Sequence, residues 1–222
     1  KRYYDYLIEI GKRKDNPARA IRLRDKTENP IQLQDLFTEK ELQSLLHPRK
    51  ERYKFLAKRN KIIMSLLVHQ GLRIGEIENL KLSDIDLEKA TIQVTGTALT
   101  NNRNLPLKAE QILLLHNYIN QDRTKLKTWR NDNNKLLLGK LGTPIRTEDV
   151  DYLITTYQKQ YKKKLTATTI RQSVLANLLS KNNDLRVVQH FAGHKHPDTT
   201  EKYRQTGLNA LKTAIDKLHP IK

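Results

Sequence analysis

One tyrosine, one histidine and two arginines are the residues of this sequence whose types and spacing best fit a chemical reaction. The run FAGHKHPDTTEKY, residues 191–203, places His194 nine residues (203 − 194) before Tyr203. Arg73 lies in the run GLRIGE and Arg171 ends the run TTIR. An activated phenol can act as a nucleophile, and two guanidiniums can hold phosphate oxygens in paired hydrogen bonds. Together these residues fit nucleophilic attack on a phosphodiester.

Each of the four residues also has a simpler interpretation. Arg73 could be a surface residue at a helix start, and Arg171 a solvated charge. His194 could be a cap behind Gly193, and Tyr203 could be a packing residue, as most of the nine tyrosines must be. The occurrence of all four, rather than any single one, favours the chemical interpretation.

The composition favours a polyanionic partner. The chain has 222 residues, with 42 Lys and Arg against 24 Asp and Glu, for a net charge of +18. Such an excess is typical of nucleic-acid-binding proteins, although a generally basic surface is the alternative. No apolar run approaches the roughly 18–20 residues of a spanning helix, and the N-terminal residues lack a signal-peptide pattern. We therefore expect no membrane association and a cytoplasmic location close to the nucleoid.

Metal and thiol chemistry have no support in the sequence. The chain has no cysteine, which excludes disulfides, thiolate metal ligands and a cysteine nucleophile. It has no HExxH motif, no cluster of acidic residues at ligand spacing and no Walker loop. We expect a reaction that needs neither a metal nor another cofactor.

Periodicity predicts a mainly α-helical chain with one small antiparallel β-sheet, an α+β architecture. A β-hairpin is expected from a strand at residues 90–94, a polar turn and the run Leu105-Pro106-Leu107, with a second short strand at 136–138. Helices are expected near residues 1–12, 38–46, 51–70, 71–80, 109–121, 147–164, 166–179, 184–191 and 208–218.

Local signals place several residues within these helices. The T-x-x-E run that starts at Thr38 is a capping box. Phe55 is expected in the buried stripe of the helix at 51–70, whereas Arg171 falls outside the apolar stripe of its own helix. Gly193 ends one helix, and Pro197 can open another that would carry Tyr203 one and a half to two turns inside it.

Three separated motifs resemble the catalytic domain of the tyrosine recombinase (phage integrase) family. The family's G-L-R-x-x-E opening stands at Gly71 to Leu80, and its H-x-x-R helix stands at Thr168 to Arg171. Its L-G-H…T-x-x-x-Y end stands here as Ala192-Gly193-His194 and Thr199 to Tyr203. The resemblance covers roughly residues 36–218 and keeps the family's order of Arg, Arg, His and Tyr.

The resemblance implies a site-specific DNA recombinase of an integrase or transposon. Arg73, Arg171, His194 and Thr168 would form the catalytic set, with Tyr203 as the nucleophile. Double-stranded DNA would be cleaved and rejoined through a 3′-phosphotyrosine link without metal or ATP. The protein would assemble as a homo-oligomer, a tetramer on DNA, through the terminal helix at 208–218.

The resemblance also predicts the domain organisation. Residues 1–35 would be the end of an N-terminal DNA-binding (core-binding) domain with its linker, and residues 36–222 the catalytic domain. Because the sequence begins without Met, inside an expected helix, we expect a preceding segment to be missing.

The sequence departs from the family pattern at two places. The hairpin turn reads Gly96-Thr97-Ala98 where the family usually carries a lysine, its usual general acid, and Thr168 replaces the family's first histidine. A threonine hydroxyl can still donate to a phosphate oxygen. The proton donor for the leaving oxygen would then be Arg103, Lys108, one of the lysines at 162–164, or a water. Lys162, Lys163 and Lys164, expected at the end of the helix at 147–164, are also candidates for DNA binding.

These departures leave two other functions open. A non-cleaving DNA-binding or regulatory protein on the same fold would need no proton donor. A type IB topoisomerase-like enzyme would use similar chemistry to relax supercoils, although the short chain and the separate terminal helix favour a recombinase.

Overall fold

The computed structural model describes residues 2–19, 31, 33–126 and 134–204. The chain divides into two compact units, residues 1–30 and 31–222. The first unit holds α1 (Arg2–Glu9), a helix without buried residues, which agrees with the helix expected there. The helix expected at 208–218 lies outside the described residues. Within those residues, no helix combines the length and apolar character needed to cross a bilayer.

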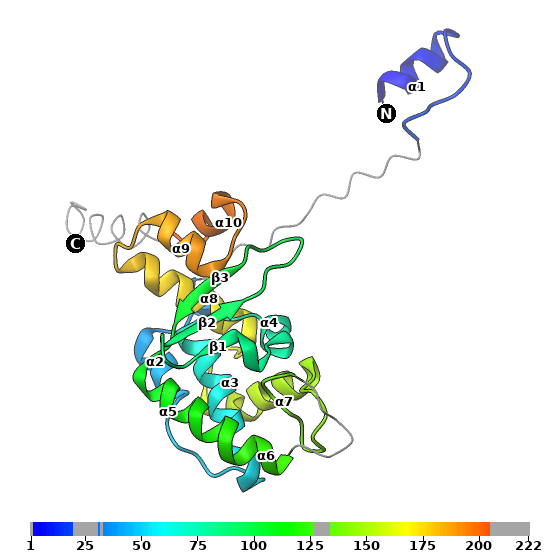
Figure 1. The fold of residues 1–222 in the computed structure, drawn as a ribbon. Helices are drawn as coiled ribbons and strands as arrows, with labels where there is room; N and C mark the ends of the chain where they lie inside the picture. Colours follow the sequence, from blue (N-terminus) through cyan, green and yellow to red (C-terminus); the bar gives the residue numbers. More distant parts are fainter. Residues whose placement is uncertain (1, 20–30, 32, 127–133, 205–222) are drawn as a thin grey trace, which may run out of the picture. The chain divides into compact units, whose positions relative to one another are not determined.

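The second unit is mainly helical with one small sheet, as predicted (Figure 1). Its elements are a 3₁₀ turn (Leu33–Asp35), α2 (Glu39–Ser44), a 3₁₀ turn (Lys54–Leu56), α3 (Ala57–His69), α4 (Ile74–Asn79), a 3₁₀ turn (Leu82–Asp84), β1 (Ile85–Asp86), β2 (Thr91–Val94), β3 (Arg103–Pro106), α5 (Ala109–Asn117), a π-helical turn (Tyr118–Asp122), α6 (Arg123–Leu126), α7 (Thr147–Tyr157), a 3₁₀ turn (Gln158–Gln160), α8 (Ala167–Ser180), α9 (Leu185–Ala192) and α10 (Pro197–Glu201).

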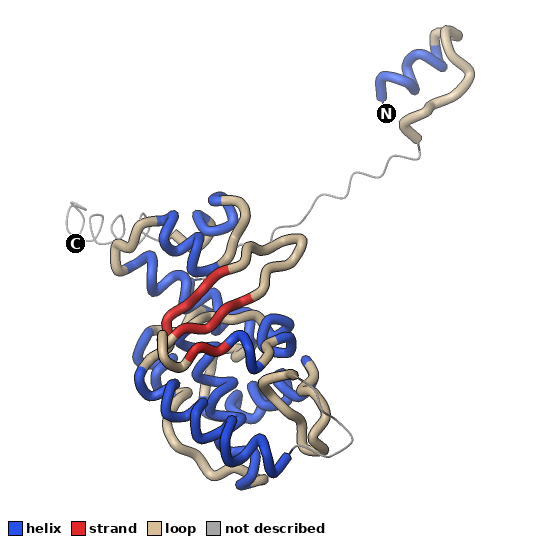
Figure 2. The backbone as a smooth tube through the Cα atoms, viewed as in Figure 1, coloured by secondary structure: helices blue, strands red, loops and turns tan. Residues whose placement is uncertain are grey.

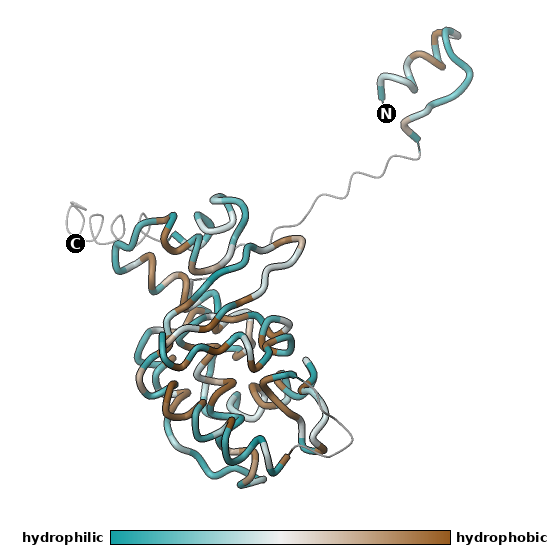
Figure 3. The backbone as a smooth tube through the Cα atoms, viewed as in Figure 1, coloured by the Kyte–Doolittle hydropathy of each residue, from teal (hydrophilic) through white to brown (hydrophobic). Residues whose placement is uncertain are grey.

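Helix α3 runs through the core of the second unit. Every residue from Ile62 to Val68 is buried, and the helix contacts α5, α7 and α8. A helix that is buried on all sides must be surrounded by other elements, which is the arrangement around α3. Figure 3 shows hydrophobic stretches along these helices. The prediction of one helix over 51–70 was too long: Phe55 lies in a separate 3₁₀ turn and is 45% exposed, so it is not part of the core.

The sheet has the order β1-β2-β3 with antiparallel neighbours (Figure 2). Val94 pairs with Arg103, and Ile92 pairs with the equally buried Leu105. The predicted hairpin is therefore confirmed, with residues 95–102 as its turn. The strand expected at 136–138 is reduced to isolated bridges, Lys81 to Lys135 and Leu138 to Pro144.

The predicted capping box opens α2. The Glu41 amide donates to Thr38 Oγ1 at 3.3 Å, and the Thr38 amide donates to the Glu41 carboxylate at 2.7 Å. The same segment is tied to α8, because the Phe37 amide donates to Ser173 Oγ at 2.8 Å. The entry to the second unit is thus held against the helix that carries Arg171.

Helices α8, α9 and α10 form the end of the described chain, and α9 contacts strand β3 of the hairpin (Figure 1). Gly193 follows α9 with a φ of +69°, the left-handed conformation in which glycine commonly ends helices.

Two predicted helices were too long. Helix α10 ends at Glu201, so Tyr203 lies just beyond it rather than inside it. Helix α7 ends at Tyr157, so the lysines at 162–164 follow the helix and do not complement its dipole.

The capping box at Thr38 should stabilise the second unit measurably. We expect Thr38→Ala to lower the free energy of unfolding by about 1 kcal/mol, because the Thr38 hydroxyl no longer accepts from the Glu41 amide or donates to the Glu41 carboxylate. Urea denaturation at neutral pH would measure this loss. Thr38→Ser keeps the hydroxyl and should remain close to the unsubstituted protein. Equal losses in both variants would show that the methyl group, rather than the cap, matters.

Candidate active site

Arg73 stands at the start of α4 with its side chain exposed. Its backbone is extended (φ −78°, ψ 153°), and its amide donates to Glu76 Oε2 at 2.9 Å. The glycine before this segment, Gly71, has a φ of +57°, which reverses the chain after α3. Arg73 is therefore held at its backbone while its guanidinium faces solvent, at a helix start that favours anions.

A buried ion pair joins α4 to the hairpin. The two terminal nitrogens of Arg103 donate to the two oxygens of Glu76, each at 2.9 Å. The side chains of Arg103 and Glu76 are 0% and 4% exposed. Burial by itself raises the pKa of Glu76, but the hydrogen bonds and charge of Arg103 outweigh it, so the pKa lies below its ordinary value and the carboxylate stays charged. Arg103 also packs against Gly193, where a Cβ atom would lie only 2.6 Å from its Nη1.

Arg171 links three segments of the site. Its guanidinium donates to the carbonyl of Gly71 at 2.6 Å and to that of Ala192 at 2.7 Å, and it lies 3.2 Å from His194 Nε2. Burial, followed by the charge of Arg73, lowers its pKa to about 10. The expectation that Arg171 lies outside the buried stripe was wrong. The residue is 6% exposed, because the carbonyl groups of two neighbouring segments satisfy its buried charge.

His194 is buried and neutral. Arginine has no acceptor, so Nε2 must accept from Arg171, which places the proton on Nδ1. Nδ1 then donates to Thr200 Oγ1 at 2.9 Å. Burial, reinforced by the charges of Arg171, Arg73 and Arg103, lowers the pKa of His194 to about 4.

Tyr203 is half-buried next to His194. The two rings are nearly parallel, with centroids 6.0 Å apart and an interplanar angle of 16°. The Tyr203 amide donates to the Thr200 carbonyl at 3.0 Å. Its ring also packs against the small cluster formed by Leu175, Leu179, Val188 and Ala192.

The structure brings Arg73, Arg171, His194 and Tyr203 into one group. The charges of both arginines act on His194, Arg171 lies 3.2 Å from His194 Nε2, and the rings of His194 and Tyr203 are stacked. Thr168 is exposed in the first turn of α8, one turn before Arg171. A cleft of about 370 Å³ adjoins Arg73 and extends between α4 and the hairpin turn, where Thr97 and Thr100 line it.

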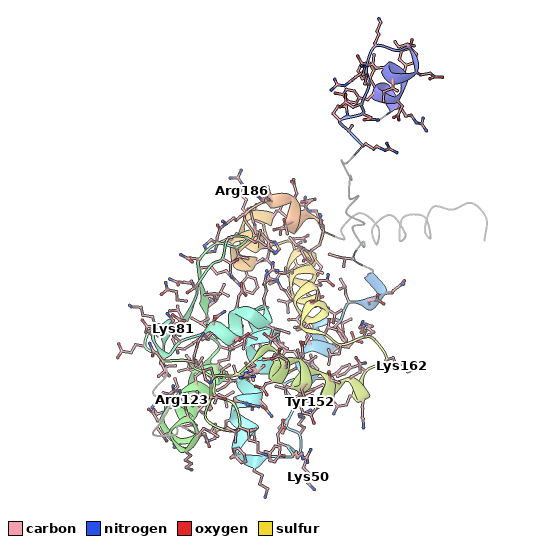
Figure 4. The ribbon with its side chains drawn as sticks, turned by 90° about the vertical axis from the view of Figure 1, so that its right-hand side faces the viewer. Lys50, Lys81, Arg123, Tyr152, Lys162 and Arg186 are labelled. Atoms are coloured by element: carbon pink, nitrogen blue, oxygen red, sulfur yellow. The ribbon has the colours of Figure 1, made fainter. Side chains whose placement is uncertain are left out.

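Of the candidates for proton donation and DNA binding, Arg103 lies within the site, whereas the lysines lie elsewhere. Arg103 is committed to its buried ion pair, and Lys108 follows the opposite end of β3, at the start of α5. Lys163 donates to the Leu36 carbonyl and to Glu41, both far from α4 along the chain. Lys162 and Lys164 are exposed, and Figure 4 shows Lys162 on the loop after α7, apart from Arg186 on α9.

Sequence reasoning gave no role to three residues of this region. Glu76 stands three residues after Arg73, a helix-start spacing that could have predicted its bond to the Arg73 amide. Thr200 orients His194, and Lys195 donates to the carbonyl of Ala98 in the hairpin turn at 2.8 Å. The Thr200 and Lys195 contacts depend on tertiary structure and have no signal in the sequence.

Comparison with models of protein families identifies the family of this chain. The model described as the phage integrase family matches residues 35–208 of the chain. The chain belongs to the phage integrase family. The fold predicted from the three motifs is therefore confirmed as the catalytic domain of a tyrosine recombinase.

Curated members of the family are similar over most of the chain. A tyrosine recombinase XerC of Thermodesulfovibrio yellowstonii is 29% identical over 226 residues, which cover 99% of this chain and 72% of the relative. A tyrosine recombinase XerD of Staphylococcus haemolyticus is 30% identical over 164 residues, covering 73% of this chain and 55% of the relative.

Solved structures of family members have the same fold. The crystal structure of XerA recombinase matches with a TM-score of 0.65 and 25% identity, over 84% of this chain and 66% of that one. The XerH site-specific recombinase, bound to a palindromic difH substrate, matches with a TM-score of 0.69 and 24% identity. That match covers 81% of this chain and 52% of XerH, so the integrase chain spans about half the length of that protein.

The integrase fold offers no cluster of metal ligands in the part of the chain that the structure describes. There, no group of three or more His, Cys, Asp or Glu side chains could hold an ion.

Replacing both Glu76 and Arg103 should destabilise the protein less than replacing Arg103 alone. We expect Arg103→Met alone to lower the free energy of unfolding by about 3–5 kcal/mol, because a buried carboxylate is left without its partner. Adding Glu76→Gln removes that charge and should recover part of the loss. Urea denaturation of both variants would measure the difference. If the double variant is less stable than Arg103→Met, Glu76 contributes independently of Arg103.

The buried His194 should make stability depend on pH. Its folded-state pKa of about 4 lies below the ordinary value of 6.5, so the unfolded chain binds a proton first as the pH falls. Stability is therefore present above pH 6.5 and is lost between pH 6.5 and about 4. We expect a loss of about 2 kcal/mol between pH 7.5 and 5 from this group.

Urea denaturation across that range would show the effect, and His194→Gln should reduce the slope. Comparison of the two proteins at pH 8, where His194 is neutral in both states, gives the pH-independent cost of the substitution. An unchanged slope in His194→Gln would assign the pH dependence to other groups, such as His69, whose pKa burial also lowers.

Proposed function

We propose that this chain carries the catalytic part of a site-specific DNA recombinase. It would cleave and rejoin double-stranded DNA through a 3′-phosphotyrosine intermediate, without metal or ATP. The observation that carries this proposal is the positive cluster beside Tyr203. The charges of Arg171, Arg73 and Arg103 all act on His194, and Glu76, which is bound to Arg103, neutralises only one of them.

The arginines would bind the phosphate that Tyr203 attacks. Arg73 is exposed and directed to solvent, and the described contacts use three of the five N–H donors of Arg171. Negative charge gathers on the non-bridging oxygens during attack, and donors that are already in place stabilise it without reorganisation. Thr168 supplies a further hydroxyl from the first turn of α8.

Tyr203 would form the covalent bond. Its Oη attacks phosphorus, the bond from phosphorus to the 5′-oxygen breaks, and the phenol proton leaves to solvent. The departing 5′-oxygen takes up one proton, so the products are a 3′-phosphotyrosine and a free 5′-hydroxyl. Attack by the 5′-hydroxyl of another strand reverses the step, so the energy of the phosphodiester is conserved and no ATP is needed.

His194 would act as a fixed neutral support rather than as a cation. Its Nε2 accepts from Arg171 and its Nδ1 donates to Thr200, which orients the guanidinium on one side and the segment before Tyr203 on the other. A buried charge at this position would repel the neighbouring arginines. Neutrality therefore keeps Arg171 available for phosphate.

The partners follow from the same reaction. The structure of XerH is bound to its difH substrate, and that of the Tn1549 transposon integrase is a complex with DNA, which supports a DNA duplex as the partner here. We further propose that residues 1–35 belong to a DNA-binding domain and linker, that Lys162 and Lys164 contact DNA, and that residues 208–218 join copies of the chain into a tetramer at the nucleoid.

Covalent capture would test the function. The 222-residue chain is incubated with a pool of nicked duplexes whose sequence around the nick is randomised, and denaturing gels separate DNA that is attached to protein. We expect an adduct that Tyr203→Phe abolishes and that Arg73→Ala and Arg171→Ala each reduce by about 10²-fold or more, because each removes transition-state stabilisation.

Tyr53→Phe is the matched control, since it removes a phenol outside the site and should leave the adduct unchanged. An adduct that survives Tyr203→Phe would show that another residue is the nucleophile. Binding of the pool without any adduct would favour the non-cleaving DNA-binding protein, the second function that the hairpin turn without lysine supports.

A further inference from the structure

The proposed reaction leaves one group without an assigned proton source, the departing 5′-oxygen. An alkoxide is a poor leaving group at neutral pH, and protonation by a positioned side chain typically accelerates such a step by about 10²–10⁴-fold. The donor must carry a proton at neutral pH, reach the cleft beside Arg73 and be able to release the proton. The inference below rests on the proposed recombinase function.

Most groups of the site fail one of these requirements. Arginines do not ordinarily release protons in proteins, which excludes Arg73 and Arg103, and the terminal nitrogens of Arg171 are held by the Gly71 and Ala192 carbonyls and by His194. His194 is neutral, its only N–H is donated to Thr200, and its other nitrogen accepts from Arg171. The hydroxyl of Thr168 is a donor of hydrogen bonds but not an acid.

The lysines considered from the sequence fail by position. Lys108 lies past the opposite end of β3 from the hairpin turn. Lys163 is held by the Leu36 carbonyl and Glu41. The turn itself, residues 95–102, contains no lysine.

Lys195 meets the requirements from a different segment. It directly follows His194, and its Nζ donates to the carbonyl of Ala98 in the hairpin turn at 2.8 Å. Two further contacts hold these segments together: the Asn101 amide donates to the Gly193 carbonyl at 2.9 Å, and Thr100 and His194 form a β-bridge. The contact of Lys195 with the turn therefore lies next to a backbone pairing that holds the two segments together.

The Lys195 ammonium group is bound to the hairpin turn that lines the cleft, although Lys195 itself is not a lining residue. Thr97 and Leu99, the neighbours of Ala98 on both sides, line the cleft beside Arg73. Lys195 is exposed, and an ammonium group has three N–H donors, of which Ala98 takes one. Two N–H groups are left to face DNA that lies against the turn.

We propose that Lys195 is the general acid of the reaction, delivered to the hairpin turn by the segment between α9 and α10. As Tyr203 Oη bonds to phosphorus and the bond to the 5′-oxygen breaks, the Lys195 ammonium transfers one proton to that oxygen. The products are the 3′-phosphotyrosine, a 5′-hydroxyl and a neutral amine, which regains its proton from solvent. In the reverse step the amine removes the proton of the attacking 5′-hydroxyl.

A sulfur substitution in the DNA separates this role from others. The duplex recovered by covalent capture is synthesised in two forms, with oxygen or with sulfur at the bridging 5′ position of the scissile phosphate. A thiol has an ordinary pKa of about 8.5, far below that of an alcohol, so a thiolate leaves without a proton donor. Single-turnover rates of adduct formation are measured for both duplexes.

We expect Lys195→Ala to slow cleavage of the oxygen duplex by about 10²-fold or more while the sulfur duplex is cleaved at nearly the native rate. Lys195→Arg should behave in the same way, because it keeps the positive charge but releases no proton. Lys202→Ala is the matched control: it removes a lysine charge beside Tyr203 and should leave the ratio of the two rates at its native value.

The other outcomes are distinct. Equal slowing of both duplexes by Lys195→Ala would overturn the proposal and make Lys195 a DNA contact. Unchanged rates on the oxygen duplex, or full activity of Lys195→Arg, would also overturn it. If the native chain forms no adduct with either duplex, the recombinase function itself fails and the proposal fails with it.

Discussion

The buried ion pair between Glu76 and Arg103 is the interaction on which the rest of the site depends. The ion pair joins the start of α4, which carries Glu76, to strand β3, which carries Arg103. The Arg103 side chain also lies against Gly193, which follows α9. Glu76 binds the Arg73 amide with the same carboxylate. Because a buried ion pair is costly to desolvate, its occurrence here is better explained by the positions it imposes than by stability. Gly193 has no Cβ, and this allows Arg103 to lie against the chain that leads to His194.

The electrostatic consequence is a site that keeps positive charge for a ligand. Glu76 neutralises Arg103, which is buried, and leaves Arg73 and Arg171 for an anion. Carbonyl groups of Gly71 and Ala192 take up part of the Arg171 charge without cancelling it. His194 stays neutral because burial and the neighbouring guanidiniums disfavour its charged form. A phosphate entering this group would complete its charge balance.

The sequence predicted those parts of the structure whose signals are local. The Thr38 capping box, the hairpin and the helix end at Gly193 each depend on a few adjacent residues, and each was confirmed. Burial of Arg171 was missed because a hydrophobic pattern cannot register a charge that is satisfied by distant carbonyl groups. Phe55 was misplaced because a 3₁₀ turn shifted it out of the helical period. The contacts of Thr200 and Lys195 depend on tertiary structure and have no signal in the sequence.

Lys195 shows why a residue missing from a motif does not decide a mechanism. Proton transfer requires a group at a position in space, and the hairpin turn is paired to the segment after α9 through Asn101 and Thr100. Once two segments are paired, a side chain from either can occupy the space above the turn. A lysine on the turn itself, which residues 95–102 lack, and Lys195 could then place an ammonium group at the same position in space. The fold must therefore preserve the pairing between the hairpin turn and the segment after α9. Arg103 lies against Gly193, at the start of that segment.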